Sequence, residues 1–383
     1  MKSIIFLLFA FSFHLNAAQK SNIKSGTGFN PLHIQIGEYW SGNTNGVFES
    51  DPPALPRKYT PRKILDRLTS LYDSLDFLKR FESFEIFDPN KEYFESQWLT
   101  ENQIQVLSGD DMRADHLTFA ILGDSTSQGP MLIKKIFDPE HSRKVFRRWL
   151  KHISGLGVDF MMHVGDMTES GTLLQYTDLI MTLNEHVNYP FLTTIGNHDL
   201  TETRFGPLPV YYNKAFGETN YYFDYRDFRF IVIDTSYNGI NKESLAWLEK
   251  ALFTGLRKVV FTHRPPAEIL ARNERDDHRI DPGCFNRGSL GFVNLMALHE
   301  VERVYVGHIH GFEAIEHRGV EYRITAGGGS PLYPVKQRVE KIYNIVVVTI
   351  TADGRFTETL HYIDGDRKGD GPIRSRPVSS PGL

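Results

Sequence analysis

The stretch VDFMMHVGD, residues 158–166, decides the fold, because an apolar run stops abruptly at a glycine and a carboxylate. The same ending occurs earlier, where LTFAIL runs into Gly123-Asp124, and later, where PFLTTI runs into Gly196-Asn197-His198-Asp199. Residues 141–153 and 171–187, which lie between these runs, have helical patterns. Short apolar strands that alternate with helices predict largely parallel strands covered by helices.

The second half of the chain holds more strands per residue. Its apolar runs, rich in β-branched and aromatic residues, are YYFDY, FRFIVI, KVVFT, ERVYV, EYRITA and YNIVVVTI. We expect several of the end strands to pair antiparallel. The sequence therefore predicts an α/β sandwich with mixed strand directions.

Two of these later strands also end on side chains that can carry chemistry. KVVFT runs into His263-Arg264-Pro265, and ERVYV runs into Gly307-His308-Ile309-His310. Glycine followed by Asp, Asn or His is common in turns, so each block alone indicates little. Five strands that all deliver Asp, Asn or His at their carboxyl ends indicate a site, because the loops of parallel α/β sheets converge at that edge.

The residue types indicate a metal site. Carboxylates, imidazoles and an amide oxygen form a mixed oxygen and nitrogen shell that suits Fe, Mn or Zn. A carboxylate shared by two such cations forms a hydrolytic site, in which a bridging water is activated to attack phosphorus in line.

The blocks GD, GD, GNHD, H and GHxH, in this order over residues 116–362, resemble the calcineurin-like metallophosphoesterase superfamily, which includes purple acid phosphatases and many phosphodiesterases. The resemblance implies a four-layer α/β/β/α sandwich with two mixed sheets and a metal site at the carboxyl ends of the strands. It also implies two divalent or trivalent metal ions, Mn, Fe or Zn.

The resemblance assigns roles to individual residues. Asp166 would bridge the two metals, Asp124 and His310 would bind the first metal, and Asn197, His263 and His308 would bind the second. His198 would lie over the phosphate and stabilise charge or protonate the leaving oxygen. Asp199 would orient His198.

The block GDST departs from this pattern. The family has a histidine where Thr126 stands, and purple acid phosphatases have a tyrosine where Glu169 stands. Either Glu169 completes the first metal site or that site has fewer protein ligands. Glu169 is also interpretable as an exposed residue at the start of a helix.

Other polar residues are weaker candidates. Arg264 and Arg287 are predicted to contact substrate, and a structural salt bridge is the alternative for Arg264. His278, in the polar segment 271–288, is a further candidate, although that segment also reads as a surface loop. His163 is interpreted as a packed strand histidine rather than a ligand.

The termini differ in texture from the rest of the chain. Lys2, the run IIFLLFAFSF and Ala17-Ala18 predict a signal peptide over residues 1–18, too short to span a membrane. An uncleaved anchor is the alternative. Residues 19–115 are predicted to be an arm with an amphipathic helix near 60–81, residues 116–364 the catalytic domain, and residues 365–383 a disordered tail.

The whole-chain composition limits the function classes. The formal net charge is -4 and no basic stripe stands out, so we expect no nucleic-acid partner. No later stretch is apolar enough to cross a membrane. Cys284 is the only cysteine, so no disulfide within the chain is expected.

The sequence predicts an exported phosphoesterase, periplasmic or extracellular, that acts on a phosphomonoester or phosphodiester, either a small molecule or a lipid. The alternative is a metal-binding or ligand-binding protein on the same fold with impaired turnover. Thr126 favours that alternative, whereas an intact His198 argues against it.

Overall fold

The computed structural model describes residues 97–109, 116–126, 139–270, 283–332, 339–365 and 369–379. All of these belong to the compact unit Arg62–Leu383. The predicted signal peptide over residues 1–18 and the predicted helix near 60–81 lie outside the described residues. Within the described residues, no helix is both long and apolar enough to span a bilayer.

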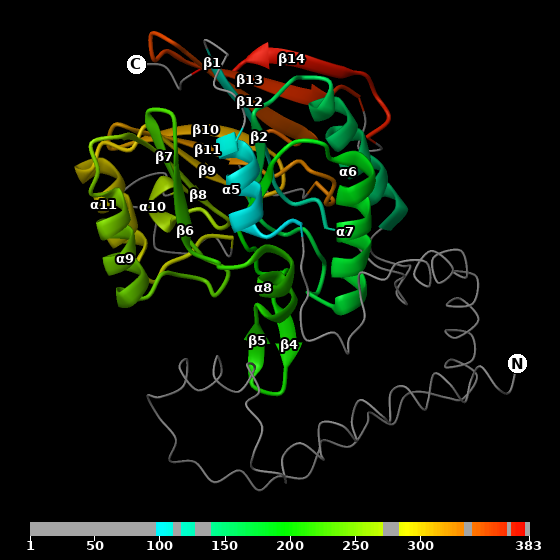
Figure 1. Cartoon of the computed structure of the whole chain (residues 1–383), viewed down its shortest axis with the longest axis horizontal. Coiled ribbons are helices and arrows are strands. Elements are labelled where there is room, and N and C mark those ends of the chain that lie inside the picture. Colours follow the sequence, from blue (N-terminus) through cyan, green and yellow to red (C-terminus); the bar gives the residue numbers. More distant parts are fainter. Residues whose placement is uncertain are drawn as a thin grey trace, which may run out of the picture. The chain divides into compact units, whose positions relative to one another are not determined.

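The first six-stranded sheet has the order β14-β13-β12-β1-β2-β3 (Figure 1). Strands β1, β2 and β3 are parallel to one another, whereas β12, β13 and β14 join antiparallel. The register pairs Leu122 with His163 and His163 with Thr193, so the three strands end level with one another. The strand bounds are β1 His116–Leu122, β2 Phe160–His163, β3 Phe191–Thr193, β12 Asn344–Thr351, β13 Phe356–Ile363 and β14 Ile373–Pro377.

The second six-stranded sheet has the order β10-β11-β9-β8-β7-β6. Strands β7, β8, β9 and β11 are parallel, and β6 and β10 are antiparallel end strands, so both sheets are mixed as predicted. The bounds are β6 Tyr221–Tyr225, β7 Phe228–Val232, β8 Arg257–Thr262, β9 Arg303–Val306, β10 Phe312–His317 and β11 Val320–Thr325. A separate hairpin pairs β4 Thr201–Thr203 with β5 Gly206–Leu208.

Three apolar clusters give the sandwich its four layers. Helices α6 Pro139–Ser154, α7 Leu173–His186 and α8 Val210–Phe216 pack with residues of β1, β2 and β12. Helices α9 Lys242–Leu252, α10 Ala267–Leu270 and α11 Ser289–Leu298 pack with β7, β8, β9 and β11. A third, aromatic cluster lies between the two sheets and includes Phe119, Phe160, Phe230, Phe261 and Tyr305. The predicted α/β/β/α sandwich is therefore the observed fold.

The domain begins earlier than residue 116. Helix α5 Thr100–Gly109, inside the predicted arm, belongs to the sandwich. Trp98 and Leu107 are buried, and the side-chain carbonyl of Gln103 accepts a hydrogen bond of 2.8 Å from the Phe191 amide of β3. The helix has few apolar positions, so its pattern does not stand out from the irregular sequence around it.

The prediction that residues 365–383 are disordered is wrong for part of that range. Residues 373–377 form β14, which pairs antiparallel with β13. The preceding turn is held by α6, because Lys144 pairs with Asp370 and Arg148 donates to the carbonyl of Gly369 at 2.7 Å. An edge strand gains its stability from backbone hydrogen bonds, so a polar sequence is compatible with it.

Candidate metal centre

The turns that carry the site have an unusual backbone. Asp124, Asp166 and His308 have φ values of 58°, 56° and 67°, in the left-handed region that most residues avoid. The glycines beside them are needed for close approach. A Cβ on Gly196 would lie 2.2 Å from Oδ1 of Asp166, and one on Gly307 would lie 2.7 Å from Oδ2 of Asp124. The GD, GN and GH blocks therefore bring side chains together more closely than other residues would allow.

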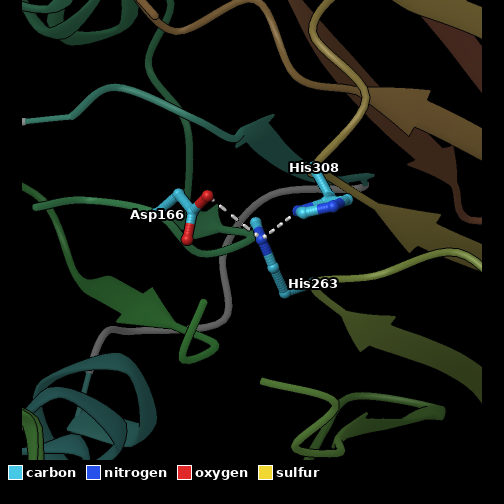
Figure 2. Close-up of side chains that lie close together, drawn as sticks. All are labelled: Asp166, His263 and His308. Atoms are coloured by element: carbon cyan, nitrogen blue, oxygen red, sulfur yellow. Dashed lines mark hydrogen bonds and ion pairs between the residues drawn. The ribbon is translucent and has the colours of Figure 1, made fainter. Parts of the chain in front are cut away.

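Four of the predicted ligands converge on one point. The Nε2 atom of His263 lies 3.3 Å from Oδ2 of Asp166, 3.2 Å from Oδ1 of Asn197 and 3.1 Å from Nδ1 of His308. Figure 2 shows the His263 ring between Asp166 and His308. These four residues are the set predicted for the second metal, with Asp166 as the shared carboxylate.

This donor set fits a cation. The Nδ1 atom of His263 donates to the carbonyl of Val164 at 2.9 Å, which leaves Nε2 to face the cluster. Burial lowers the pKa of His263, but the Asp166 carboxylate beside it outweighs burial and raises the pKa to about 9. Burial raises the pKa of Asp166, and the surrounding histidines lower it to well below its usual range. An anionic carboxylate that draws positive charge into a buried site, with an amide oxygen and imidazoles around it, matches what Mn, Fe or Zn require.

The residues predicted for the first metal form a looser set. His310 Nε2 lies 3.3 Å from Oδ1 of Asp124, and His310 Nδ1 donates to the carbonyl of Pro331 at 2.7 Å. The other Asp124 oxygen accepts the His308 amide at 2.8 Å. Among the residues that the structure describes, Asp166, His263 and His308 form the only group of at least three His, Cys, Asp or Glu side chains with ligand atoms all within 4.8 Å. Asp124 and His310 are thus paired with each other, outside that group.

Thr126 occupies the position where the family has a histidine. It is buried, with φ of 30°, and its hydroxyl is hydrogen-bonded to that of Ser330 at 2.9 Å. Ser330 follows three glycines at the end of β11, and its amide donates to the carbonyl of Asp124 at 2.9 Å. The run GGGSP, residues 327–331, therefore supports both Asp124 and His310. The sequence reasoning missed it, although a glycine run directly after a strand was the available signal.

Hydrogen bonds hold both the backbone and the ring of His198. Its amide donates to Oδ1 of Asp166 at 2.9 Å, and its ring Nδ1 donates to the carbonyl of Glu169 at 2.8 Å. That hydrogen bond does not use the other ring nitrogen, Nε2. Burial lowers the pKa of His198, while the charge of Asp166 and the Glu169 carbonyl raise it overall.

Asp199 does not orient the His198 ring, contrary to the expectation. Its carboxylate accepts the amides of Asp166 and Gly196 at 2.9 Å on one oxygen. The other oxygen accepts the amides of Met167 at 2.9 Å and Thr168 at 2.8 Å. Asp199 thus shapes the turn that carries the bridging carboxylate, while the Glu169 carbonyl holds the ring of His198.

The two predicted substrate arginines differ in their positions. Nη1 of Arg264 lies 3.0 Å from Nε2 of His308, at the edge of the ligand cluster. Arg287 is exposed, and its carbonyl accepts the Ile240 amide at 2.8 Å. His278 lies outside the described residues. His163 is fully buried between Phe146 and Phe191, with Nε2 3.0 Å from the Ser125 hydroxyl, as expected for a packed strand histidine.

Comparison with known proteins supports the same chemistry. Residues 117–312, just over half of the chain, match the family described as calcineurin-like phosphoesterase. The chain is 32% identical over 180 residues to a protein of Arcobacter nitrofigilis named probable glycerophosphodiester phosphodiesterase GpdQ. That alignment covers 44% of this chain and 63% of the relative, so the chain spans less than two thirds of the relative's length.

A solved structure shares the fold. The purple acid phosphatase PPD1 from yellow lupin (Lupinus luteus) seeds superposes with a TM-score of 0.52 at 17% identity. The match covers 69% of this chain and 54% of the lupin protein.

Proposed function

The chain belongs to the calcineurin-like phosphoesterase family, and from that premise we propose that it is an exported hydrolase of phosphate esters, with a dinuclear metal site, that acts on a phosphodiester. The observation that carries the proposal is the convergence of Asp166, Asn197, His263 and His308 on one point beside His198. The name of the Arcobacter relative favours a phosphodiester over a phosphomonoester.

The proposed roles follow from these contacts. Bound metal ions would activate water as the nucleophile and neutralise charge on the phosphate. Asp166, Asn197, His263 and His308 would hold one cation, and Asp124 and His310 would hold the other together with Asp166. His198, fixed through Nδ1 by the Glu169 carbonyl, presents Nε2 to the leaving oxygen and delivers its proton. Arg264 lies where it can pair with a phosphate oxygen.

The activity is tested with two aryl substrates. Metal-free protein is loaded with Mn, Zn or Fe, and hydrolysis of bis(p-nitrophenyl) phosphate is compared with that of p-nitrophenyl phosphate. We expect metal-dependent turnover with the diester preferred, and none in a matched Asp166→Asn preparation. Metal-loaded wild type that hydrolyses neither substrate, nor a glycerophosphodiester, would favour the alternative of a binding protein on this fold.

Export rests on residues 1–18 alone, which lie outside the described residues. The n-region, apolar run and Ala17-Ala18 favour cleavage before Gln19. Mass spectrometry of protein isolated from its native source should therefore find a chain that begins near Gln19. Recovery of the full-length chain from the cytosol would contradict this expectation.

A further inference from the structure

Asn344, the first residue of β12, is a fully buried amide that uses both of its side-chain polar atoms. Nδ2 donates to the carbonyls of Gly311 and Ile342, each at 3.0 Å, and Oδ1 accepts the hydroxyl of Thr325 at 3.0 Å. Because a carbonyl can only accept, the two carbonyls fix which end of the amide is the nitrogen. A buried amide that lost these partners would be costly, so the three contacts hold the side chain in one orientation.

These contacts join the two sheets beside the first predicted metal site. Asn344 begins a strand of the first sheet, whereas Gly311 leads into β10 and Thr325 ends β11 of the second sheet. The pair of Asp124 and His310 spans the sheets in the same way, because Asp124 follows β1 and His310 precedes Gly311. The separation of that pair therefore depends on what holds the two sheets together at this point.

Asn344 holds the backbone next to His310. The Gly311 carbonyl, one residue after His310, accepts both the Asn344 side chain and the Ala326 amide at 3.0 Å. Gly311 has φ of 153°, and a Cβ there would lie 2.4 Å from Cγ1 of Val339, so glycine is required at this position. The turn that carries His310 is therefore fixed by hydrogen bonds and by close packing.

Asn344 also anchors the loop that holds the ring of His310. Its backbone amide donates to the Gly327 carbonyl at 3.1 Å, and a Cβ on Gly327 would lie 2.3 Å from Asn344 Nδ2. Gly327 begins the run 327–331. The carbonyl of Pro331, at the other end of this run, accepts a hydrogen bond of 2.7 Å from His310 Nδ1. One residue thus holds His310 at its backbone and, through this loop, at its ring.

We propose that Asn344 is a positioning residue that sets the separation of His310 from Asp124 and, through it, the affinity of the first metal site. This inference rests on the proposed function, because it concerns the same centre. The side-chain hydrogen bonds of Asn344 reach none of the four residues predicted to hold the second metal. Replacing Asn344 should therefore affect the two sites unequally.

Titration of Mn²⁺ into the metal-free full-length protein tests this role. Wild type should bind one cation tightly and one weakly, and His310→Ala should identify the weak site as the first by abolishing it. Asn344→Leu keeps the size of the side chain and removes its hydrogen bonds. It should weaken the first site by about 10- to 100-fold, the usual cost of losing a group that orients a metal ligand. The second site should keep its affinity.

Gln103→Met is the matched control. Gln103 is also a buried amide with hydrogen bonds to backbone groups, but it lies in α5. Its replacement should lower the Tm and leave both metal affinities unchanged. A double-mutant cycle adds a second control, because Asn344→Leu combined with His310→Ala should leave the remaining site within about 2-fold of its affinity in His310→Ala alone.

A milder variant keeps the test available if Asn344→Leu does not fold. Thr325→Val removes only the hydroxyl that Asn344 accepts, and it should weaken the first site by about 2- to 5-fold. An unchanged first site in the variants that fold, equal weakening of both sites, or the same loss in Gln103→Met would overturn the proposal. Wild type that binds a single cation would contradict the dinuclear site itself, and this inference with it, before any variant is compared. The titration does not use turnover, so its failure is distinct from failure to hydrolyse phosphate esters.

Discussion

At the scale of single residues, the side chains of the segment Gly196-Asn197-His198-Asp199 make contacts of different kinds. Asn197 turns its amide oxygen to His263 in the ligand cluster, while the His198 ring is fixed by the Glu169 carbonyl. Asp199 collects backbone amides from the turn of Asp166. One strand end thus supplies a proposed metal ligand, Asn197, a proposed acid, His198, and a support for a different strand end, Asp199.

These contacts predict that substitutions of His198 and of Asp166 have different effects on metal content and on activity. His198→Ala should retain metal and lose about 10²–10⁴-fold in kcat, the usual contribution of a positioned acid or base. Asp166→Asn should lose metal and activity together, because it removes the anion of the cluster. Metal content by mass spectrometry beside kcat separates the two. Loss of metal from His198→Ala would mean that its role has been assigned wrongly.

Thr126 predicts unequal metal sites. Its hydroxyl is paired with Ser330, and Asp124 and His310 stand outside the converged group, so the first metal should be partly lost on dialysis while the second is retained. Thr126→His should raise the retained metal toward two per chain, provided the ring faces Asp124. Glu169→Gln tests whether that carboxylate already completes the site. Two metals per wild-type chain after dialysis, unaffected by Glu169→Gln, would rule out a weak first site.

At the scale of elements, α6 and β13 meet through two histidines that make stability depend on pH. Nε2 of His152 lies 2.9 Å from Nδ1 of His361, and burial, with the charge of His152, lowers the pKa of His361 to about 4. In the unfolded chain His361 has a pKa of about 6.5, so between that pH and about pH 4 it is protonated in the unfolded chain and neutral in the folded one. This contribution to stability therefore falls as pH drops from about 6.5 to 4.

His361→Asn isolates that effect. In urea unfolding at several pH values, the free energy of unfolding should decrease less for the variant than for the wild type between pH 6.5 and 4. Above pH 7 the two curves should run parallel, since both states of His361 are then neutral. Parallel curves at acid pH as well would show that His361 is protonated in the folded protein.

Elements also show where sequence reasoning succeeds and where it fails. The parallel strands and their polar ends were predictable, because an apolar run and the residues after it are contiguous in sequence. Strand β14 was not, because a polar edge strand depends on the free edge of β13 rather than on its own composition. The pairing of Thr126 with Ser330 joins residues 204 positions apart, and the partners of Asp199 are backbone amides that carry no sequence signature.

At the scale of the whole sandwich, the ligands come from both sheets. Asp166 and Asn197 follow strands of the first sheet, and His263 and His308 follow strands of the second. A bound cation would therefore link the two sheets. A ligand that binds only the folded state stabilises that state by about 2.7 kcal/mol when the free ligand concentration is 100 times Kd. Chelation should lower the Tm of wild type by several degrees and leave that of Asp166→Asn unchanged. Equal melting of chelated and metal-loaded wild type would contradict this linkage.

The aromatic layer between the sheets acquires a second role from that arrangement. Phe230 of the second sheet meets Phe119 and Phe160 of the first, with ring centroids 5.5 Å and 5.2 Å apart, so these rings help to set the distance between the two sheets and between the ligands that each sheet carries. The spacing of the proposed metal ligands then depends on rings that are fully buried in the core. A substitution that shortens one of these rings would change the distance between the two sheets while leaving every proposed ligand in place.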